Sequence, residues 1–398
     1  MNFEIDPSFG KLRDMIGFLG RERLRPLGLE ADALGGPLPP EHPFFQEVLD
    51  MGLTGGFMGK SPKERTDDDG RARRTIRRAV VMAEEAAYWD RGMATSLPGP
   101  GLGGAPVMIM GTPDQKERLL GPFKDRSQPR WSAFGMTEPG AGSDVARIRT
   151  RFQEDGDDFV VNGEKVFISN GARASFVVCW GTVDPTAGRK GHRALVVEAG
   201  TPGFEVAKIE KKMGLCASET ASLVFQDCRV PKANLLQADT DGGSFKGAMK
   251  TFDMTRPMVA AMAVGIAQAA LDEATRFADE NFTGPSAWRR TRVEDRLSRC
   301  RGKVEMGRLY AWKAAWLGDH KKPNAVAASM AKAACAPIAL EVASLGMEIL
   351  GEAGGACDHL IEKLYRDVKA LDIVEGTGQI QRIVIARRLL GYEGERHE

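Results

Sequence analysis

The stretch Phe134-Gly-Met-Thr-Glu-Pro-Gly-Ala-Gly-Ser-Asp144 decides most of what the sequence predicts. Its glycines and proline make a loop whose backbone can approach a ligand closely, and Thr137 and Ser143 add hydroxyl groups. Backbone N–H groups in such a loop can receive a phosphate or the polar edge of a ring. Further along, Lys165-Val-Phe-Ile-Ser-Asn-Gly171 supplies an aromatic ring and another hydroxyl. Together the two stretches predict a site for a large, flat cofactor that carries a phosphate.

Glycine-rich loops are most often only turns, but the complete string over 137–144 is more specific than its glycines. It is not the phosphate loop of a Rossmann crossover, because no βα unit surrounds it. The string resembles the flavin-binding signature of the acyl-CoA dehydrogenase family, and residues 165–171 resemble the second flavin segment of that family.

Composition and charge describe an ordinary globular protein. The chain has 398 residues, long enough for two or three domains, with 55 basic and 54 acidic residues and a formal net charge of +1. This balance gives no general attraction to nucleic acid or to an anionic membrane. The first residues do not predict a basic and apolar leader, and we expect no stretch to approach the roughly 20 apolar residues of a membrane span. We therefore expect a cytoplasmic protein without membrane insertion and without a nucleic-acid partner.

The six cysteines form no C-x-x-C pair and the five histidines are scattered. These patterns predict reduced thiols and no metal site.

Three zones of different periodicity predict an α+β multidomain fold. Residues 1–130 read as an N-terminal helical domain, 131–240 as a small β-barrel or sandwich, and 241–398 as a C-terminal four-helix bundle. The same layout, a β domain between two helical domains, is implied by the family resemblance. The expected helices cover 44–51, 72–87, 245–280, 293–318, 324–352 and 379–390, and the short expected strands cover 176–180, 194–197 and 221–225.

Local signals predict where some of these elements begin and end. Thr112 with Gln115 forms a capping box that opens a helix. Residues 67–70 and 96–104, rich in glycine, proline or aspartate, are predicted to be loops. Asn162-Gly163 is the strongest short hairpin signal in the chain, and it places a hairpin tip inside the run 159–168.

The segment Asp372-Ile-Val-Glu-Gly-Thr-Gly-Gln-Ile-Gln-Arg382 holds the predicted catalytic residue, Glu375. A lone glutamate before a helix is ordinarily a charge favoured by the helix dipole. Here the whole string resembles the segment that carries the catalytic base of the family. Proton abstraction next to a thioester carbonyl needs a carboxylate whose pKa is raised toward neutrality, which an apolar pocket achieves. The resemblance implies that the Glu375 N–H also binds the thioester oxygen, and that hydride transfer to flavin gives a trans-2,3-enoyl-CoA.

The resemblance assigns further roles by position. Asp253 and Arg256 lie three residues apart on one helix, and a surface ion pair is the alternative interpretation of that spacing. Long-chain and branched-chain members place their base on this helix, which here has no glutamate until Glu273. The residues implied for FAD binding are Phe134, Met136, Thr137, Gly142, Ser143, Phe167, Ile168 and Ser169, with Thr377 and Gln379 at the adenosine half. Those implied for substrate binding are Ser143, Asp253, Arg256 and Gly376.

Three positions depart from the family pattern where a neighbouring subunit would contact the FAD pyrophosphate. Asn281 replaces an arginine, Glu348 a glutamine and Glu352 a glycine, and each change makes the charge less favourable for a diphosphate. Three explanations remain open. Arg289, Arg290 or Arg292 replaces the arginine in a homo-oligomer; a homologous second subunit completes the site; or FAD binding is weak, or the chain is a non-redox structural subunit.

The resulting expectation is an FAD-dependent acyl-CoA dehydrogenase of fatty acid β-oxidation and lipid metabolism. It would pass electrons to an electron-transfer flavoprotein and form a homodimer or homotetramer, or a hetero-oligomer. An acyl-CoA oxidase or a flavin monooxygenase of the same fold is the alternative, and a non-catalytic partner subunit is a third. Glu375 disfavours the monooxygenase, which has no use for such a base. The sequence does not name the acyl group.

Overall fold

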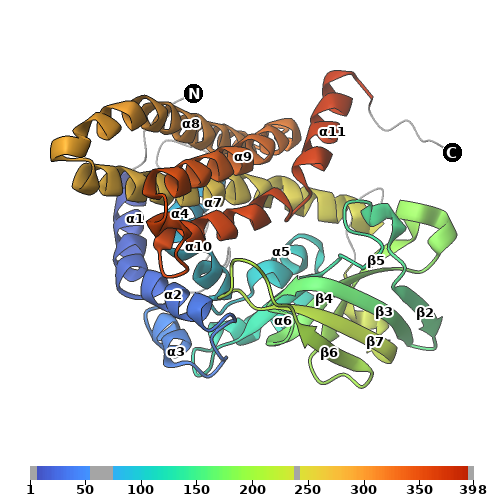
Figure 1. Cartoon of the computed structure of the whole chain (residues 1–398). Coiled ribbons are helices and arrows are strands. Elements are labelled where there is room, and N and C mark those ends of the chain that lie inside the picture. Colours follow the sequence, from blue (N-terminus) through green and yellow to red (C-terminus); the bar gives the residue numbers. More distant parts are fainter. Residues whose placement is uncertain (1–6, 54–74, 237–242, 393–398) are drawn as a thin grey trace.

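A computed structural model describes residues 7–53, 75–236 and 243–392 of the chain (Figure 1). Helices occupy both ends of the sequence and a β-sheet lies between them, which confirms the predicted fold class. The β domain lies beside and below the helical body in the view of Figure 1. The loop predicted at 67–70, and residues 72–74 of the helix predicted over 72–87, lie outside the described residues.

In residues 7–53 and 75–130, the secondary structure that precedes the first strand is helical. The buried side chains of Phe44, Phe45, Val48 and Leu49 give the expected helix over 44–51 its apolar face. The predicted capping box is confirmed: Thr112 Oγ1 accepts from Gln115 N at 3.2 Å, and Gln115 Oε1 accepts from Thr112 N at 3.0 Å. The helices are α1 (Pro7–Leu19), α2 (Arg25–Ala33), α3 (Pro43–Asp50), α4 (Thr75–Ser96), α5 (Gly101–Met110) and α6 (Pro113–Leu120), with a π-helical turn at Gly20–Leu24.

The loop predicted over 96–104 is shorter than expected, because α5 begins at Gly101. Its buried residues include Val107 and Met110, which belong to the same core cluster as residues of the sheet. Packing against β1 (Trp131–Gly135) therefore overrides the low helix propensity of the glycines in this segment.

The middle region forms one eight-stranded sheet. After β1 its strands are β2 (Arg151–Asp155), β3 (Asp158–Ser169), β4 (Ala174–Thr182), β5 (His192–Glu198), β6 (Phe204–Ile209), β7 (Thr220–Pro231) and β8 (Leu235–Leu236). The strands predicted over 176–180, 194–197 and 221–225 are confirmed within β4, β5 and β7. Neighbouring strands follow the order β6-β7-β3-β2-β4-β5-β8, and β1 pairs in parallel with β4 as an additional neighbour.

Both faces of this sheet are buried along β4. Val177 and Cys179 belong to a cluster that gathers side chains from β2, β3, β5 and β7. The alternating residues Phe176, Val178 and Trp180 face a second cluster that includes α5 and α6. Because distant strands share the first cluster, the sheet curves around it, in agreement with the predicted small barrel or sandwich.

The prediction of a hairpin tip at Asn162-Gly163 was wrong. Both residues lie inside β3, which pairs with β7, and the register shifts between Val161 and Gly163. Gly163 has φ 148°, and a Cβ there would lie 2.6 Å from Thr150 Oγ1. Gly163 therefore lies at a β-bulge, and its lack of a side chain allows the backbone to approach Thr150 closely. The real turn joins Asp155 to Asp158 between β2 and β3, with Gly156 at φ 58°.

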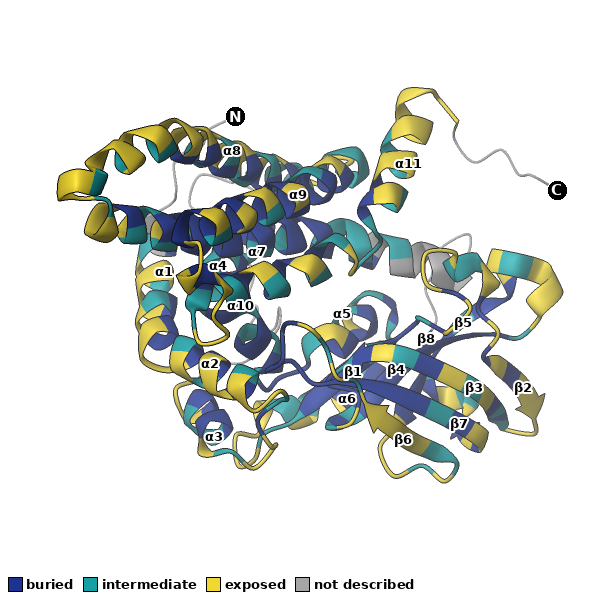
Figure 2. Ribbon diagram, viewed as in Figure 1, coloured by how far each residue is buried: buried dark blue, intermediate teal, exposed yellow. Residues whose placement is uncertain are grey.

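The long helices α7 (Gly243–Asn281), α8 (Ala287–Asp319) and α9 (Ala325–Leu350) and the short helix α10 (Leu360–Val368) pack together with α4. Gly265 lies where α7 and α4 meet, and a Cβ there would be 2.1 Å from Glu84 O, so the two helices approach as closely as glycine allows. Small residues such as Ala260, Ala267 and Ala274 fill the same core. The last helix that the structure describes is α11 (Gly378–Leu389). Figure 2 shows α11 projecting from the body with mostly exposed residues.

A buried charge cluster fastens the C-terminal helices to the N-terminal region. Lys363 Nζ on α10 lies 2.6 Å from Asp90 Oδ2 on α4 and 2.6 Å from Asp367 Oδ2. Asp90 interrupts α4 with φ −160°, and its Oδ1 accepts from Met93 N at 2.8 Å.

Two helices are long and apolar enough to cross a membrane by length and composition, contrary to the expectation from the sequence. They are Thr251–Asn281 and Ala325–Leu350, and 78% and 61% of their most apolar windows are buried within the chain. Both contribute to the core of the helical body, where the same composition serves helix packing.

Candidate functional site

The predicted flavin loop leaves β1 and is fixed by one buried carboxylate. Glu138 accepts hydrogen bonds from Arg149 N at 2.6 Å, Thr150 N at 2.9 Å and Thr150 Oγ1 at 2.6 Å. Lys165 Nζ lies 2.7 Å from Glu138 Oε1 and also donates to Met136 O at 3.1 Å. The fully buried Lys165 thus connects the two predicted flavin segments.

The opposite charges of Glu138 and Lys165 stabilise each other. Burial raises the pKa of Glu138, but Lys165 and the hydrogen bonds from Thr150 and Arg149 more than offset this, so the net pKa is lowered. Glu138 therefore stays ionised in the folded protein and keeps Lys165 paired.

The exposed side of the loop is open and polar. A Cβ added at Gly140 or Gly142 would meet no atom within 4 Å. Gly142 and Ser143 are exposed, Phe134 and Thr137 are half-buried, and Met136 is buried. Phe134 packs between Trp180 and Phe252, with ring centroids 5.8 Å apart in both contacts.

The end of β3 brings the second segment beside the first. Val166 N donates to Thr137 O at 2.9 Å, which ties the segments together. Phe167 is 65% exposed and has φ 60°, an unusual backbone conformation for an aromatic residue and one that keeps its ring out of the core. Ser169 is half-buried. The side chain of Ile168 lies in the sheet core, which leaves only its backbone for contact with a ligand.

Glu375 lies in the loop between Asp372, at the end of a 3₁₀ turn (Lys369–Asp372), and α11. It is half-buried with φ 55°, and the next residue, Gly376, has φ 93°. Its Oε2 accepts a hydrogen bond of 2.6 Å from Thr255 Oγ1 on α7. Burial raises the pKa of Glu375, and the Thr255 hydrogen bond together with nearby cations opposes part of that rise.

The cations near Glu375 come from three helices: Arg256 on α7, Arg91 on α4 and Lys332 on α9. Arg256 Nη1 lies 2.9 Å from Asp253 Oδ1, and its side chain is only 8% exposed. The side chain of Asp253 is 29% exposed, so the two residues form a partly buried ion pair and not a fully exposed one. Burial lowers the pKa of Arg256 and raises that of Asp253, as expected for charges removed from water.

The remaining predicted residues, Gly376, Thr377 and Gln379, lie at the N-terminal end of α11. Thr377 caps the helix, since its Oγ1 accepts from Ile380 N at 3.4 Å. Gln379 is exposed and Gly376 is half-buried. Gln381 Nε2 donates to Glu375 O at 3.3 Å and to Gly376 O at 3.1 Å, so this buried amide supports the loop from below.

Sequence reasoning missed Thr255, Arg91, Lys332 and Gln381, which all lie near Glu375. Thr255 carried no local signal, because its partner lies 120 positions away. Lys332 did carry one: it is a single charge within the apolar run 325–340 of α9, where a lysine needs a polar partner.

Two of the three positions that depart from the family pattern, Asn281 and Glu348, make hydrogen bonds within the chain, and the third, Glu352, is exposed. Arg296 Nη2 lies 2.6 Å from Glu348 Oε2, and Asn281 Nδ2 donates to Phe277 O at 2.9 Å. Arg290 is paired with Asp279 and Glu294, whereas Arg289 and Arg292 lie over the ring of the exposed Trp288 at 5.5 and 5.8 Å.

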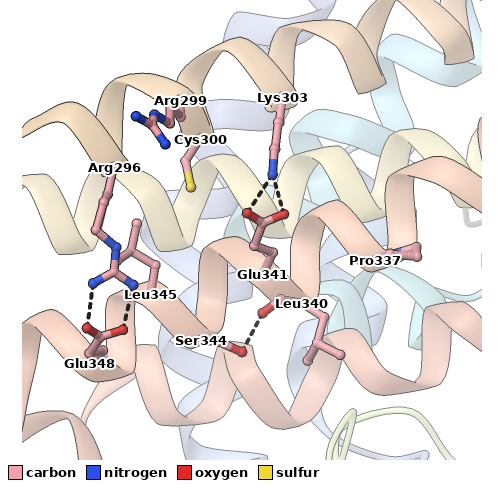
Figure 3. A pocket seen from close by; sticks show the side chains of 10 residues that line it. All are labelled: Arg296, Arg299, Cys300, Lys303, Pro337, Leu340, Glu341, Ser344, Leu345 and Glu348. Carbon is pink, nitrogen blue, oxygen red and sulfur yellow. Dashed lines mark hydrogen bonds and ion pairs between the residues drawn. The ribbon is translucent and has the colours of Figure 1, made fainter.

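A pocket of about 600 Å³ lies between α8 and α9, and Arg296 and Glu348 both line it. Figure 3 shows these two side chains facing each other. Lys303 also lies there, with Nζ 2.6 Å from Glu341 Oε1. None of the residues predicted to hold FAD or substrate, all of them in the described part of the chain, lines this pocket.

The fold and these side chains define a class: an enzyme scaffold of two helical regions around a β domain, with a titratable carboxylate held by the helical side. The model of the acyl-CoA dehydrogenase middle domain matches residues 133–228, and that of the acyl-CoA dehydrogenase C-terminal domain matches 242–390. The chain belongs to the acyl-CoA dehydrogenase family.

Individual relatives agree with this assignment. The chain is 34% identical over 402 residues to the acryloyl-CoA reductase (NADH) of Anaerotignum propionicum, covering 97% of this chain and 96% of the relative. It is 39% identical over 286 residues to the mitochondrial short-chain specific acyl-CoA dehydrogenase of Mus musculus, covering 72% and 68%. The butyryl-CoA dehydrogenase structure from Megasphaera elsdenii superposes with a TM-score of 0.87 at 32% identity, covering 98% of this chain and 100% of that one.

Proposed function

We propose that this chain is an FAD-dependent acyl-CoA dehydrogenase that converts an acyl-CoA thioester to its trans-2,3-enoyl-CoA. The observation that carries the proposal is the environment of Glu375. Its carboxylate is partly buried, its pKa is raised by that burial, and it is oriented by Thr255 beside the buried Arg256. A general base needs this combination, because it must be ionised near neutral pH and still accept a proton.

Glu375 removes the proton from the carbon next to the thioester carbonyl. Thr255 holds one carboxylate oxygen, which leaves the other for the substrate. The three surrounding cations oppose part of the rise in the Glu375 pKa that burial causes, and so favour its ionised form. The N–H of Glu375 is the donor that binds the thioester oxygen as negative charge develops there. Asp253, Arg256, Ser143 and Gly376 contact the substrate.

The residues present fit an FAD molecule. Phe167 offers an exposed aromatic face near the end of β3, and Gly142 leaves open space above a loop whose hydroxyls, Thr137 and Ser143, are accessible. Phe134, Met136, Ile168 and Ser169 complete the part near the ring, and Thr377 and Gln379 bind the adenosine half. When bound, FAD supplies the acceptor for the hydride that leaves the β-carbon.

The relatives guide the choice of substrate. Two of them are named for short-chain or butyryl-CoA dehydrogenation and one for acryloyl-CoA reduction, so a short acyl-CoA is the first substrate to test. The reaction is followed as anaerobic loss of flavin absorbance over acyl-CoAs of increasing length. Glu375→Gln should retain flavin and lose about 10²–10⁴-fold or more of the reduction rate. Near-normal flavin reduction in that variant would refute the assignment of the base.

The oxidase alternative is separated by the fate of the reduced enzyme. A dehydrogenase reoxidises slowly in oxygen and quickly with an electron-transfer flavoprotein, whereas an oxidase reoxidises quickly in oxygen. A solved structure described as the electron transferring flavoprotein of Acidaminococcus fermentans contains a chain with a TM-score of 0.86 and 32% identity to this one. We therefore propose an electron-transfer flavoprotein as the physiological acceptor.

The subunit arrangement is tested by flavin content. A homodimer or homotetramer, with Arg289 or Arg292 beside the neighbour's pyrophosphate, would bind one FAD per chain when expressed alone. Arg290 is the weaker candidate, because it is already paired with two carboxylates. Expression without flavin would instead favour a homologous second subunit. A role in cytoplasmic fatty acid β-oxidation remains a prediction.

A further inference from the structure

A buried lysine on α9 lies directly behind the loop that carries Glu375. Lys332 is 1% exposed, and its Nζ donates to Asp372 O at 2.9 Å and to Gly376 O at 2.7 Å. No carboxylate oxygen in the described ranges lies within ion-pair distance of this ammonium group. Its hydrogen bonds therefore go to backbone carbonyls on either side of the catalytic glutamate.

Burying an ammonium group in this way is costly, so packing alone does not account for it. Burial lowers the pKa of Lys332 to about 8, and Asp372 and Glu375 oppose this change. A methionine would fill the same space between α9 and the loop without that cost. A lysine here is explained by what its hydrogen bonds hold in place.

The loop that Lys332 holds has an unusual backbone. Glu375 and Gly376 are consecutive residues with positive φ, and a glutamate rarely adopts this conformation without support. Gln381 Nε2 donates to the carbonyls of the same two residues, so Gly376 O accepts from both Lys332 and Gln381. Two buried donors from different helices thus fix the conformation that directs the Glu375 side chain toward Thr255.

We propose that Lys332 is a positioning residue for Glu375: its ammonium group holds the carbonyls of Asp372 and Gly376 and thereby sets the position and charge state of the base. The inference rests on the proposed function. Besides Lys332, the groups that face the Glu375 carboxylate are Thr255 and Arg256 from α7 and Arg91 from α4. The charged groups near Lys332 itself are Asp372, Glu375 and Arg256.

The test compares the flavin-loaded wild type with Lys332→Met in anaerobic rapid-mixing experiments with a short acyl-CoA between pH 5 and 9. Displacement of the base should lower the limiting rate of flavin reduction about 10²-fold without a matching change in KM. Loss of a nearby cation should raise the pH midpoint of that rate by about one unit. Lys332→Arg keeps the charge and two donors, and should restore the midpoint and part of the rate.

A matched control separates positioning from general loss of stability. Val342→Ala removes buried volume from the same helix, away from the loop, and should lower the melting temperature while leaving the pH midpoint unchanged. If Lys332→Met does not fold, Lys332→Gln replaces it, because the amide retains a donor without the charge; its midpoint should also rise. An unchanged rate and pH midpoint in the lysine variants would overturn the role of Lys332 and leave the proposed function intact. A wild-type flavin that no acyl-CoA reduces would overturn the proposed function as well.

Discussion

Thr255 Oγ1 donates a hydrogen bond of 2.6 Å to Glu375 Oε2, and this bond joins residues 120 positions apart in the chain. It connects the longest helix, α7, with the loop that precedes the last helix, α11. The orientation of the proposed base is therefore set by the packing of two elements and not by the segment that contains it.

Replacing Thr255 with valine tests this relationship. Valine keeps the shape of threonine but donates no hydrogen bond, and the ionised form of Glu375 loses a stabilising partner. The pH midpoint of flavin reduction should rise by about one unit or more, since a hydrogen bond to a charged group contributes about 1.5–3 kcal/mol. Thr255→Ser retains the hydroxyl and should keep the wild-type midpoint. Identical pH profiles for valine and serine would contradict the role of this bond.

The stability of Glu375→Gln should depend on pH. The folded pKa of Glu375 lies above its ordinary value of 4.5. Between these two values the unfolded chain releases a proton that the folded chain retains, so the wild type loses stability as pH rises through this window. At pH values above the pKa of Glu375 in the folded protein, the loss of stability has reached its full size. The variant should therefore melt at a higher temperature than the wild type at pH 7, and the difference should disappear by about pH 4.

Thermal unfolding at both pH values measures this effect. Glu117→Gln provides the control, because Glu117 is an exposed glutamate whose partner, Lys124, is also on the surface. Its difference from the wild type should be small at both pH values. A stabilisation of Glu375→Gln that is equally large at pH 4 would show that burial of charge is not its cause.

Breaking the buried pair beneath the flavin loop should destabilise the protein strongly. Lys165→Met leaves Glu138 buried without its cation, which typically costs about 3–5 kcal/mol. The double variant Lys165→Met/Glu138→Gln removes both charges and should recover part of that loss in chemical unfolding experiments. Flavin should dissociate more readily from the single variant, because Lys165 also holds Met136 O. Equal stability of the single and double variants would contradict a coupled pair.

The contact between α4 and α7 predicts the effect of a single methyl group. In Gly265→Ala the new Cβ would press against Glu84 O, and the resulting overpacking should cost about 1–3 kcal/mol or more. Gly302→Ala is the matched control: it also lies inside a helix, and nothing lies within 4 Å of the added carbon. That substitution should stabilise the protein by about 0.4–1 kcal/mol. The two melting temperatures should move in opposite directions.

What the sequence predicted correctly was encoded in contiguous residues. The apolar run of β4 and the cap at Thr112 are local patterns, and the structure has the corresponding strand and capping box. The hairpin at Asn162-Gly163 failed because pairing of β3 with β7 outweighed a strong local turn preference. The helix at Gly101 was missed for a similar reason, since packing against β1 outweighs its glycines.

In the candidate site, too, a local pattern predicts some residues, and only the packing of helices brings the others together. Glu375 was predicted from its own segment, whereas Thr255 and Lys332 become its neighbours only through the packing of α7 and α9. The burial of Arg256, which makes its pair with Asp253 a partly buried one, also depends on helix packing. Interactions of this kind have no short sequence pattern.

The packing of α4 among α7, α8 and α10 has a consequence for how the polypeptide reaches its native state. One continuous helical core is encoded in two separated portions of the chain, and the β domain is an insertion between them. During synthesis the β domain can complete its own sheet early, while α4 must wait for its partners to emerge from the ribosome. The N-terminal third is therefore the part most in need of protection in the nascent protein, and the helical core should form from separately expressed halves only when they are combined.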